Sequence, residues 1–306
     1  MADDLTLVAD VGGTNTRFAL ADANGIVVGS AARYANCDVD SFVDAAQAYV
    51  LTLNGASPSN LCAAIAGPVS GGTGKITNGN WVFDTDVLSN TLGMKRVYLL
   101  NDLVALGYAL DVLPSGMVTQ VGGGKSQGSQ ALVAGIATGF NISMCHAGQV
   151  TEAELGHASL PNSVMDVLRH AIGNQADKFR TVESLFSGGG ISTLHTALGF
   201  DAADPAKITA QDGDTVALFA KTLGVFCREM AYQYMPLAGL YFNGSVARAV
   251  LGSATAGKIV AAEAGKDEAF LGRFGQVPLY LITEDNAALY GCARYAHRQA
   301  GAGGNF

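Results

Sequence analysis

One stretch near the N-terminus constrains the fold more than any other: LVADVGGTNTRFAL, Leu7–Leu20. Two apolar runs flank a turn that holds a carboxylate, Asp10, the pair Gly12–Gly13, and the hydroxyl groups of Thr14 and Thr16. Apolar runs on both sides of a glycine turn predict two paired, buried strands. The polar groups of the turn then lie together at one end of this pair.

The same pattern recurs in the second half of the chain, at ALVAGIATGFNISMCHAGQVT. In both halves, later apolar strands lead into helical periodicity, as in RVYLLNDLVALGYAL and VPLYLITEDNAALYGCARYA. Strands that alternate with helices predict an α/β fold, and the recurrence predicts two related domains with a cleft between them. We expect a smaller α/β domain at residues 1–110 with a C-terminal helix at 287–306, and a larger one at 111–286.

Local signals give finer detail in the smaller domain. They predict strands at Leu5–Val11, Thr16–Ala21 and Gly25–Arg33. A helix that Asp38 or Ser41 would cap follows these strands.

Composition argues against several classes of partner. The chain has 306 residues, of which 49% are hydrophobic and 14% charged, which is enough apolar material for two cores. Its net charge of -8 argues against nucleic acid as a partner. Five scattered cysteines without a C-x-x-C pair indicate neither a zinc site nor a disulfide framework. The acidic N-terminus lacks the basic region of a signal peptide, and the long uncharged stretch at 126–151 is broken by polar residues. We therefore expect a cytoplasmic protein with no membrane partner.

The first glycine turn has the chemistry of a phosphate site. Gly12 and Gly13 allow backbone amides to approach an anion closely, and Thr14 and Thr16 add hydroxyl donors. Asp10 would repel phosphate unless a divalent cation such as Mg²⁺ lay between them. The alternative is a simple hairpin turn in which Asp10 bonds its own backbone. The sequence has no G-x-x-x-x-G-K-[ST] motif.

Two further positions carry similar pairs of interpretations. Gly135–Phe140 is a second candidate phosphate turn, with Thr138 and Gly139 as its informative residues, or an ordinary tight turn. Asn101 and Asp102 lie where a strand ends and a helix begins. Ligands bind at such strand ends in open α/β sheets, although a helix cap is the alternative.

The remaining candidates suit recognition of a polyhydroxyl ligand. Glu154 and His157 lie three residues apart in TEAELGH, where the alternative is a solvated loop. Glu183 precedes three glycines and reads otherwise as a first-turn helix carboxylate. Asn78 lies near the only tryptophan, Trp81, in what is otherwise a simple Asn-Gly turn.

Taken together and in order, DVGGTNTR, AGP, TNGNW, LLNDL, ATG, E-x-G-H, VES-x-x-SG and NGSVAR resemble the bacterial ATP-dependent glucokinases. Those enzymes belong to the actin/sugar-kinase/Hsp70 superfamily, and the resemblance runs over nearly the whole chain. It implies two ribonuclease-H-like domains of the actin-like ATPase fold, with an active-site cleft between them. It also implies the cofactors ATP and Mg²⁺, a hexose substrate and a homodimer.

The resemblance also assigns roles to individual residues. Asp102 matches the catalytic base. The positions that match sugar contacts are Asn78, Asn101, Asp102, Glu154, His157 and Glu183. Those that match the ATP-binding motifs are Asp10, Gly12, Gly13, Thr14, Thr138, Gly139, Gly239 and Gly244. Asp10 would also bind Mg²⁺, directly or through water.

The chain departs from the family pattern in its second phosphate turn. Ala137 and Asn141 stand where that pattern has glycines, and Asn243–Gly244 replaces a double glycine. The expected activity is phosphorylation of glucose to glucose 6-phosphate. The alternatives are a kinase for another hexose or an amino sugar, and a sugar- or nucleotide-binding regulator on the same fold.

Overall fold

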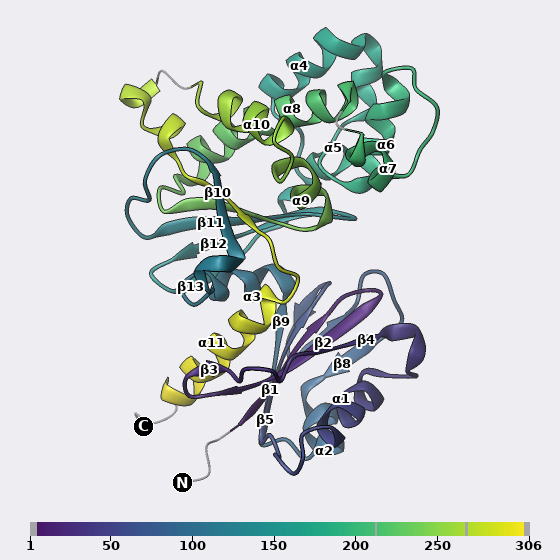
Figure 1. Ribbon diagram of the computed structural model, residues 1–306, viewed down its shortest axis with the longest axis vertical. Helices are drawn as coiled ribbons and strands as arrows, with labels where there is room; N and C mark the ends of the chain where they lie inside the picture. The colour runs from purple at the N-terminus through teal and green to yellow at the C-terminus, as the bar shows by residue number, and fades with distance from the viewer. Residues whose placement is uncertain (1–4, 212, 267–268, 303–306) are drawn as a thin grey trace. The chain divides into compact units, whose positions relative to one another are not determined.

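The computed structural model describes residues 5–211, 213–266 and 269–302. Residues 1–4 and 303–306, assigned above to the smaller domain, and 212 and 267–268, assigned to the larger, lie outside this range. The chain divides into two compact units, Met1–Leu113 with Asp285–Phe306, and Pro114–Glu284 (Figure 1).

The first unit is built on a mixed sheet in the order β3-β2-β1-β5-β9, with β4 also paired to β2. Strands β1 and β2 are antiparallel, whereas β1, β5 and β9 run parallel. The strands are β1 (Thr6–Val11), β2 (Asn15–Asp22), β3 (Gly25–Ile26), β4 (Ala32–Ala35), β5 (Asn60–Ile65) and β9 (Arg96–Asn101). A separate small sheet contains β6 (Val69–Ser70), β7 (Thr73–Lys75) and β8 (Val82–Asp84).

The single strand predicted at Gly25–Arg33 is wrong, because β3 and β4 are separate. Gly29 has a φ of +77°, which is incompatible with a continuous strand. In this interruption, the Ser30 hydroxyl oxygen accepts the N–H of Leu20 at 3.0 Å, so a side chain takes over one ladder bond.

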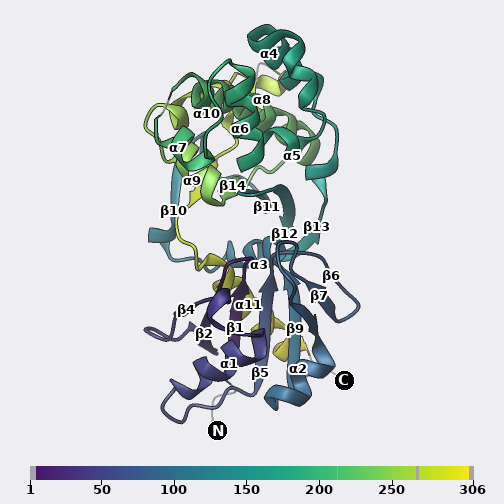
Figure 2. The same cartoon turned by 90° about the vertical axis from the view of Figure 1, so that its right-hand side faces the viewer.

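Helices cover both faces of this sheet (Figures 1 and 2): α1 and α2 on one face, α3 and α11 on the other. Ser41 caps α1 by accepting the N–H of Asp44, which decides between the two predicted caps. Phe18 of β2 packs on Phe42 and Tyr49 of α1, with ring centroids 5.6 and 5.3 Å away. The helical elements are η1 (Asn36–Asp38), α1 (Phe42–Leu51), α2 (Thr85–Leu92), α3 (Asp102–Ala109) and α11 (Ala287–Ala302).

The second unit repeats the same sheet plan, in the order β10-β15-β14-β11-β12-β13. Strands β11 and β12 form an antiparallel hairpin, and β11, β14 and β15 run parallel, as β1, β5 and β9 do in the first unit. This shared order confirms the predicted internal duplication. The strands are β10 (Val118–Gly122), β11 (Gln130–Ile136), β12 (Phe140–His146), β13 (Gln149–Glu152), β14 (Gly239–Asn243) and β15 (Leu279–Ile282).

A group of helices packs against the sheet of the second unit (Figure 1). An aromatic cluster fills this core, in which Phe186 stacks on Phe226 with centroids 4.9 Å apart and Phe140 meets Phe226 at 5.7 Å. The longer helices are α4 (Asn162–Ile172), α6 (Gly188–Ala197), α8 (Asp214–Tyr234) and α10 (Ala256–Ala264). The short ones are η2 (Ser115–Met117), η3 (Leu155–His157), η4 (Gly173–Lys178), α5 (Val182–Leu185), α7 (Pro205–Ala210), α9 (Ser245–Leu251), η5 (Ala269–Gly272) and η6 (Phe274–Gln276).

Among the residues that the structure describes, no helix combines the length and apolar character needed to span a bilayer.

Candidate active site

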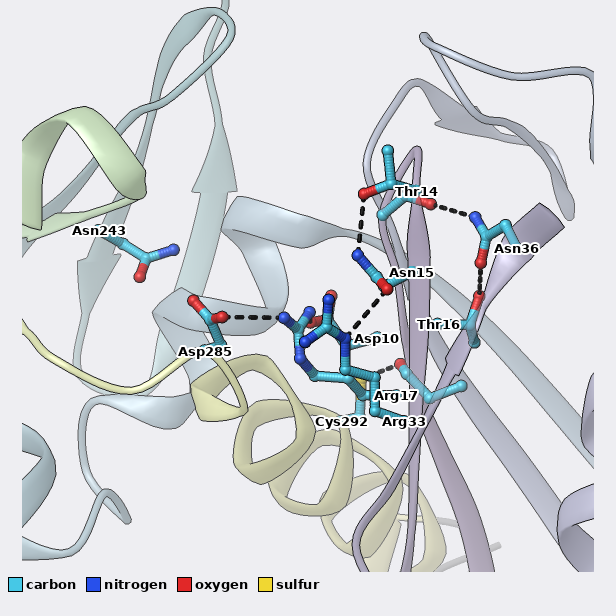
Figure 3. A network of polar contacts seen from close by, with 12 residues as sticks. Asp10, Thr14, Asn15, Thr16, Arg17, Arg33, Asn36, Asn243, Asp285 and Cys292 are labelled. Carbon is cyan, nitrogen blue, oxygen red and sulfur yellow. Dashed lines mark hydrogen bonds and ion pairs between the residues drawn. The ribbon is translucent and has the colours of Figure 1, made fainter. Parts of the chain in front are cut away.

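The turn between β1 and β2 is held in shape by Asn36 (Figure 3). The Nδ2 of Asn36 donates to the Gly12 carbonyl at 2.8 Å, and its Oδ1 accepts the Thr16 hydroxyl at 2.9 Å. The backbone N–H of Asn36 also donates to the Thr14 carbonyl at 2.9 Å. These bonds fix the turn with protein groups alone. They also show that the expectation of a ligand-binding hydroxyl at Thr16 is wrong, because Thr16 is fully buried and donates to Asn36.

Asn78 packs directly on this turn. A Cβ added to Gly13 would lie 3.0 Å from the Asn78 carbonyl oxygen and 3.3 Å from its Cβ. A side chain at position 13 would push Asn78 away by a few tenths of an ångström, so glycine permits this close packing. The same contact places Asn78, a predicted sugar-binding residue, beside the predicted phosphate turn.

Asp10 is a carboxylate of this region whose pKa is strongly perturbed. Leu7, Ala9 and Val11 of β1 belong to the core under α1, so the alternation of the strand turns Asp10 to the opposite face. Burial raises the pKa of Asp10 to about 7, and the charges of Asp102 and Asp285 add to this rise while Arg17 opposes it.

Arg17 links two of these carboxylates (Figure 3). Its Nη1 lies 3.4 Å from Asp10 Oδ2, and its Nη2 lies 2.9 Å from Asp285 Oδ2. One guanidinium thus pairs with Asp10 and Asp285, while the charge of Asp102 also acts on Asp10, so carboxylates outnumber the guanidinium that pairs with them. Such an oxygen donor set fits a hard divalent cation. Within the described ranges, no group of three or more His, Cys, Asp or Glu side chains is arranged to hold a metal, so substrate oxygens or water would have to supply further ligands.

Asn101 and Asp102 lie at the carboxyl edge of the same sheet. The parallel register aligns Val11 of β1 with Ile65 of β5, and Ile65 with Asn101 of β9. Asn101 caps α3 by accepting the Leu103 N–H at 3.0 Å, and its Nδ2 donates to the Gly67 carbonyl at 3.1 Å.

Asp102 is the first residue of α3, and its Oδ1 also accepts the Leu103 N–H, at 2.9 Å. Its charge acts on Asp10. The cap interpretation of Asn101 is therefore correct, and it places Asp102 at the edge of the sheet where ligands bind.

In the second unit, the β11–β12 turn is stabilised from α6. The Gly188 N–H donates to the Ala137 carbonyl at 2.8 Å, and the Ala137 N–H donates to the Gly139 carbonyl at 3.0 Å. Neither Ala137 nor Asn141 has a positive φ. The loss of glycine at these two positions therefore does not strain the turn.

Gly139 instead leaves room for the Glu183 carboxylate. A Cβ there would lie 2.5 Å from Oε2 of Glu183, which accepts the Phe140 N–H at 3.0 Å. Glu183 stands in the first turn of α5, which a Thr181–Ser184 capping box begins. The structure thus brings the predicted sugar-binding Glu183 to the second phosphate turn.

A pocket of about 390 Å³ opens beside this turn, entirely within the second unit. Its volume is in the range of small-molecule sites. Its lining includes Thr138, Gly188, Gly189, Asp204, Pro205 and Ser245.

The predicted adenosine motif lies partly at this pocket. Gly244 has a φ of +106° and precedes Ser245, and a Cβ at Gly244 would collide with the Ile136 carbonyl. Gly239 lies at the opposite end of β14, where a Cβ would lie 2.7 Å from the ring of Tyr280. The structure therefore brings Thr138 and Gly244 together, and places Gly239 in a packing position away from them.

Glu154 immediately precedes the short turn η3, and His157 is its last residue. Both side chains are exposed. They are available to a ligand from the second unit, as Asn78 is from the first.

Sequence reasoning did not assign roles to Arg17, Asn36 or Asp285. Arg17 lies inside the quoted motif DVGGTNTR, and Asp285 follows the last strand, β15. An acidic residue just after a parallel strand was the available signal for Asp285. Asn36 offered none, because nothing local marks it as the residue that closes a turn more than twenty positions earlier.

A duplicated α/β fold has glycine–threonine turns at strand ends, carboxylates beside one turn and a pocket beside the other. This arrangement suits a nucleotide-dependent phosphotransferase, which must position phosphates and stabilise their charge. The comparisons with known proteins agree. The family model described as Glucokinase matches residues 7–299. A glucokinase of Yersinia pestis is 30% identical over 325 residues, covering 96% of this chain and 97% of that relative.

Solved structures extend the likeness to the fold. A glucokinase from an Antarctic psychrotroph superposes with a TM-score of 0.82 at 27% identity, covering 96% of this chain and 99% of that one. A ROK family glucokinase from Streptomyces griseus, in complex with glucose and AMPPNP, gives a TM-score of 0.65 at 18% identity, with 96% and 99% covered.

The chain belongs to the glucokinase family. It is a hexokinase-type sugar kinase of the actin-like ATPase fold, as its motifs predicted.

Proposed function

We propose that the enzyme transfers the γ-phosphoryl group of ATP to the primary hydroxyl of glucose, forming glucose 6-phosphate and ADP. The observation that carries this proposal is the presence of Asp102 and Asp10 at one edge of the first sheet, close enough for the charge of Asp102 to raise the pKa of Asp10. A base and a cation-binding carboxylate are the two groups that phosphoryl transfer to a hydroxyl requires there.

Asp102 is the catalytic base in this proposal. Its carboxylate accepts the proton of the primary hydroxyl while the hydroxyl oxygen forms its bond to the γ-phosphorus. The bond from that phosphorus to the bridging oxygen breaks, and ADP leaves with the electron pair. The position of Asp102 at the start of α3, fixed by the Asn101 cap, supports this role because a base must be held within reach of its proton.

The two glycine turns hold the phosphates. Gly12, Gly13 and Thr14 provide the first turn, which Asn36 holds rigid, and Thr138 and Gly139 provide the second. Donors that are already in place when charge develops stabilise the transition state without reorganisation. The pocket beside Thr138 and Gly244 takes the nucleoside.

Asp10 is the residue that would hold Mg²⁺, directly or through water. Mg²⁺ supplies neutralisation of phosphate charge. The fit rests on the local excess of carboxylates over the one guanidinium of Arg17.

The hexose-binding groups of this proposal are Asn78, Asn101, Asp102, Glu154, His157 and Glu183. Hydrogen bonds from fixed side chains discriminate between sugar epimers, because a misplaced hydroxyl leaves a buried polar group unpaired. That the phosphate-binding turns and the hexose-binding groups face one cleft stays a prediction. We further propose that the two units are the functional domains and that the enzyme is a cytoplasmic homodimer. Light scattering on the purified protein tests whether it is a dimer.

The test is ADP release with Mg-ATP across glucose, mannose, fructose, glucosamine, N-acetylglucosamine, N-acetylmannosamine and no sugar. Stimulation by glucose supports the proposal. Stimulation by another sugar alone would support the same reaction with that sugar as the substrate. Nucleotide binding without turnover on any sugar would favour a regulator.

Asp102→Asn tests the base directly. We expect turnover to fall by roughly 10²–10⁴-fold while glucose binding is retained. The matched control is Asp86→Asn, because Asp86 is an exposed carboxylate in the first turn of another helix of the same unit. Near-normal turnover of Asp102→Asn would remove Asp102 from this role.

A further inference from the structure

Asn141 makes contacts that a glycine could not make. It is the second residue of β12, and its Oδ1 accepts two backbone N–H groups, that of Ile142 at 2.9 Å and that of Leu155 at 3.0 Å. The first of these bonds is local. The second joins β12 to a residue fourteen positions away, the first residue of the turn η3.

The turn η3 carries two of the predicted hexose-binding side chains, Glu154 immediately before it and His157 at its end. No side chain caps it at Glu154. The turn also lies directly against β12, because a Cβ at Gly156 would collide with the Phe140 carbonyl oxygen. The Asn141 bond to Leu155 is thus the side-chain anchor of the segment that presents Glu154 and His157.

The same short piece of β12 anchors the third such side chain. The Phe140 N–H donates to Glu183 at 3.0 Å. Phe140 and Asn141 follow the second phosphate turn in sequence, so one dipeptide contacts both segments that carry the predicted hexose ligands of this unit.

We propose that Asn141 is a positioning residue for hexose recognition, which holds the Glu154–His157 turn by accepting the Leu155 N–H. The inference rests on the proposed function, because it concerns the hexose contacts of that site. Position 141 does not have a positive φ, so the asparagine adds an acceptor without straining the strand. Binding groups must be held close to their productive geometry, so a loosened turn weakens hexose binding before it affects ATP.

Steady-state kinetics on the full chain tests the role. Asn141→Ala removes the acceptor and should raise the KM for glucose about tenfold, the equivalent of one lost hydrogen bond, with the KM for ATP unchanged. Asn141→Asp keeps an acceptor oxygen and should retain the wild-type KM for glucose. Asn141→Gly, which restores the residue of the family pattern, provides a second loss variant if Asn141→Ala does not fold.

Ser253→Ala is the matched control. The Ser253 hydroxyl also accepts two backbone N–H groups, those of Thr255 and Ala256, at 3.2 and 3.1 Å, but before α10. The Ser253→Ala variant should have the wild-type KM for glucose and the wild-type KM for ATP. Thermal unfolding of each variant without ligand separates lost stability from lost binding.

The outcomes separate the two proposals. A wild-type enzyme that is inactive on every hexose overturns the proposed function itself. An active wild type whose KM for glucose is unchanged in Asn141→Ala and Asn141→Gly overturns only the role of Asn141. Equal rises in both KM values, or an Asn141→Asp variant as impaired as Asn141→Ala, would also overturn it.

Discussion

Ionisation of the buried Asp10 carboxylate destabilises the folded protein at neutral pH, and replacing Asp10 tests this directly. Its pKa is raised from 3.8 to about 7, chiefly by burial. Between these values the folded state binds more protons than the unfolded state, so the free energy of unfolding falls as pH rises through this window. Above pH 7 the full destabilisation by the ionised Asp10 carboxylate is present, and below about pH 4 it is absent.

The size of the effect follows from the same two values. At about 1.4 kcal/mol per pH unit, the difference between 3.8 and about 7 corresponds to about 4 kcal/mol. Because the side chain remains 14% exposed, some solvent relaxation reduces this figure. The carboxamide that Asp10→Asn introduces cannot ionise, so we expect this variant to be more stable than the wild type at pH 8 by about 1–4 kcal/mol. Arg17 retains Asp285 as a partner in the variant.

The assay is urea unfolding of wild type and Asp10→Asn at pH 8 and pH 5, followed by circular dichroism. The gain in the free energy of unfolding should shrink at pH 5, and turnover should be lost at both pH values. Asp86→Asn is the control, because Asp86 is an exposed carboxylate of the same unit and should show little change. A variant that is less stable than wild type at pH 8, or a difference that is independent of pH, would refute the reasoning.

Three further predictions test the site and its surroundings. Gly139→Ala should displace the Glu183 carboxylate, which lies 2.5 Å from the added Cβ, and raise the KM for the hexose about tenfold in coupled assays. Asn36→Ala leaves the first phosphate turn without its clamp and should raise the KM for ATP and lower the free energy of unfolding by about 1–3 kcal/mol, measured by urea unfolding. In native protein, Cys37 should be the cysteine that reacts rapidly with Ellman's reagent, because the other four are buried, and denaturation should release all five; fast reaction of Cys37→Ser would contradict this.

The sequence determined the elements of the fold where the signal was local. Apolar runs ended by glycine turns predicted β1, β2, β11 and β12, and the recurrence of this pattern predicted the duplication. The pattern failed at Gly25–Arg33, because a strand was extended through Gly29, whose left-handed φ interrupts it. Residue types alone do not reveal such a φ, since glycine adopts both signs readily.

The sequence also located the contiguous parts of the candidate site. Asp10, Gly12, Gly13 and Thr14 lie within five positions, and Asn101 and Asp102 are neighbours, so a short window contains their chemistry. The alternative interpretation of Asn101 as a cap was correct as well, because one carboxamide can cap a helix and hold the next residue at the edge of a sheet.

Only the tertiary structure decided which distant groups surround these residues. Arg17 bonds Asp285 across 268 positions, Glu183 meets Phe140 across 43, and Asn141 meets Leu155 across 14. Electrostatic interactions and hydrogen bonds act over a few ångströms of space and not along the chain, so no local pattern contains them. The apolar periodicity and glycine turns of the sequence thus fix strands and ligand turns, whereas the pKa of Asp10 and the anchoring of Glu154 and His157 arise from contacts that exist only in the folded chain.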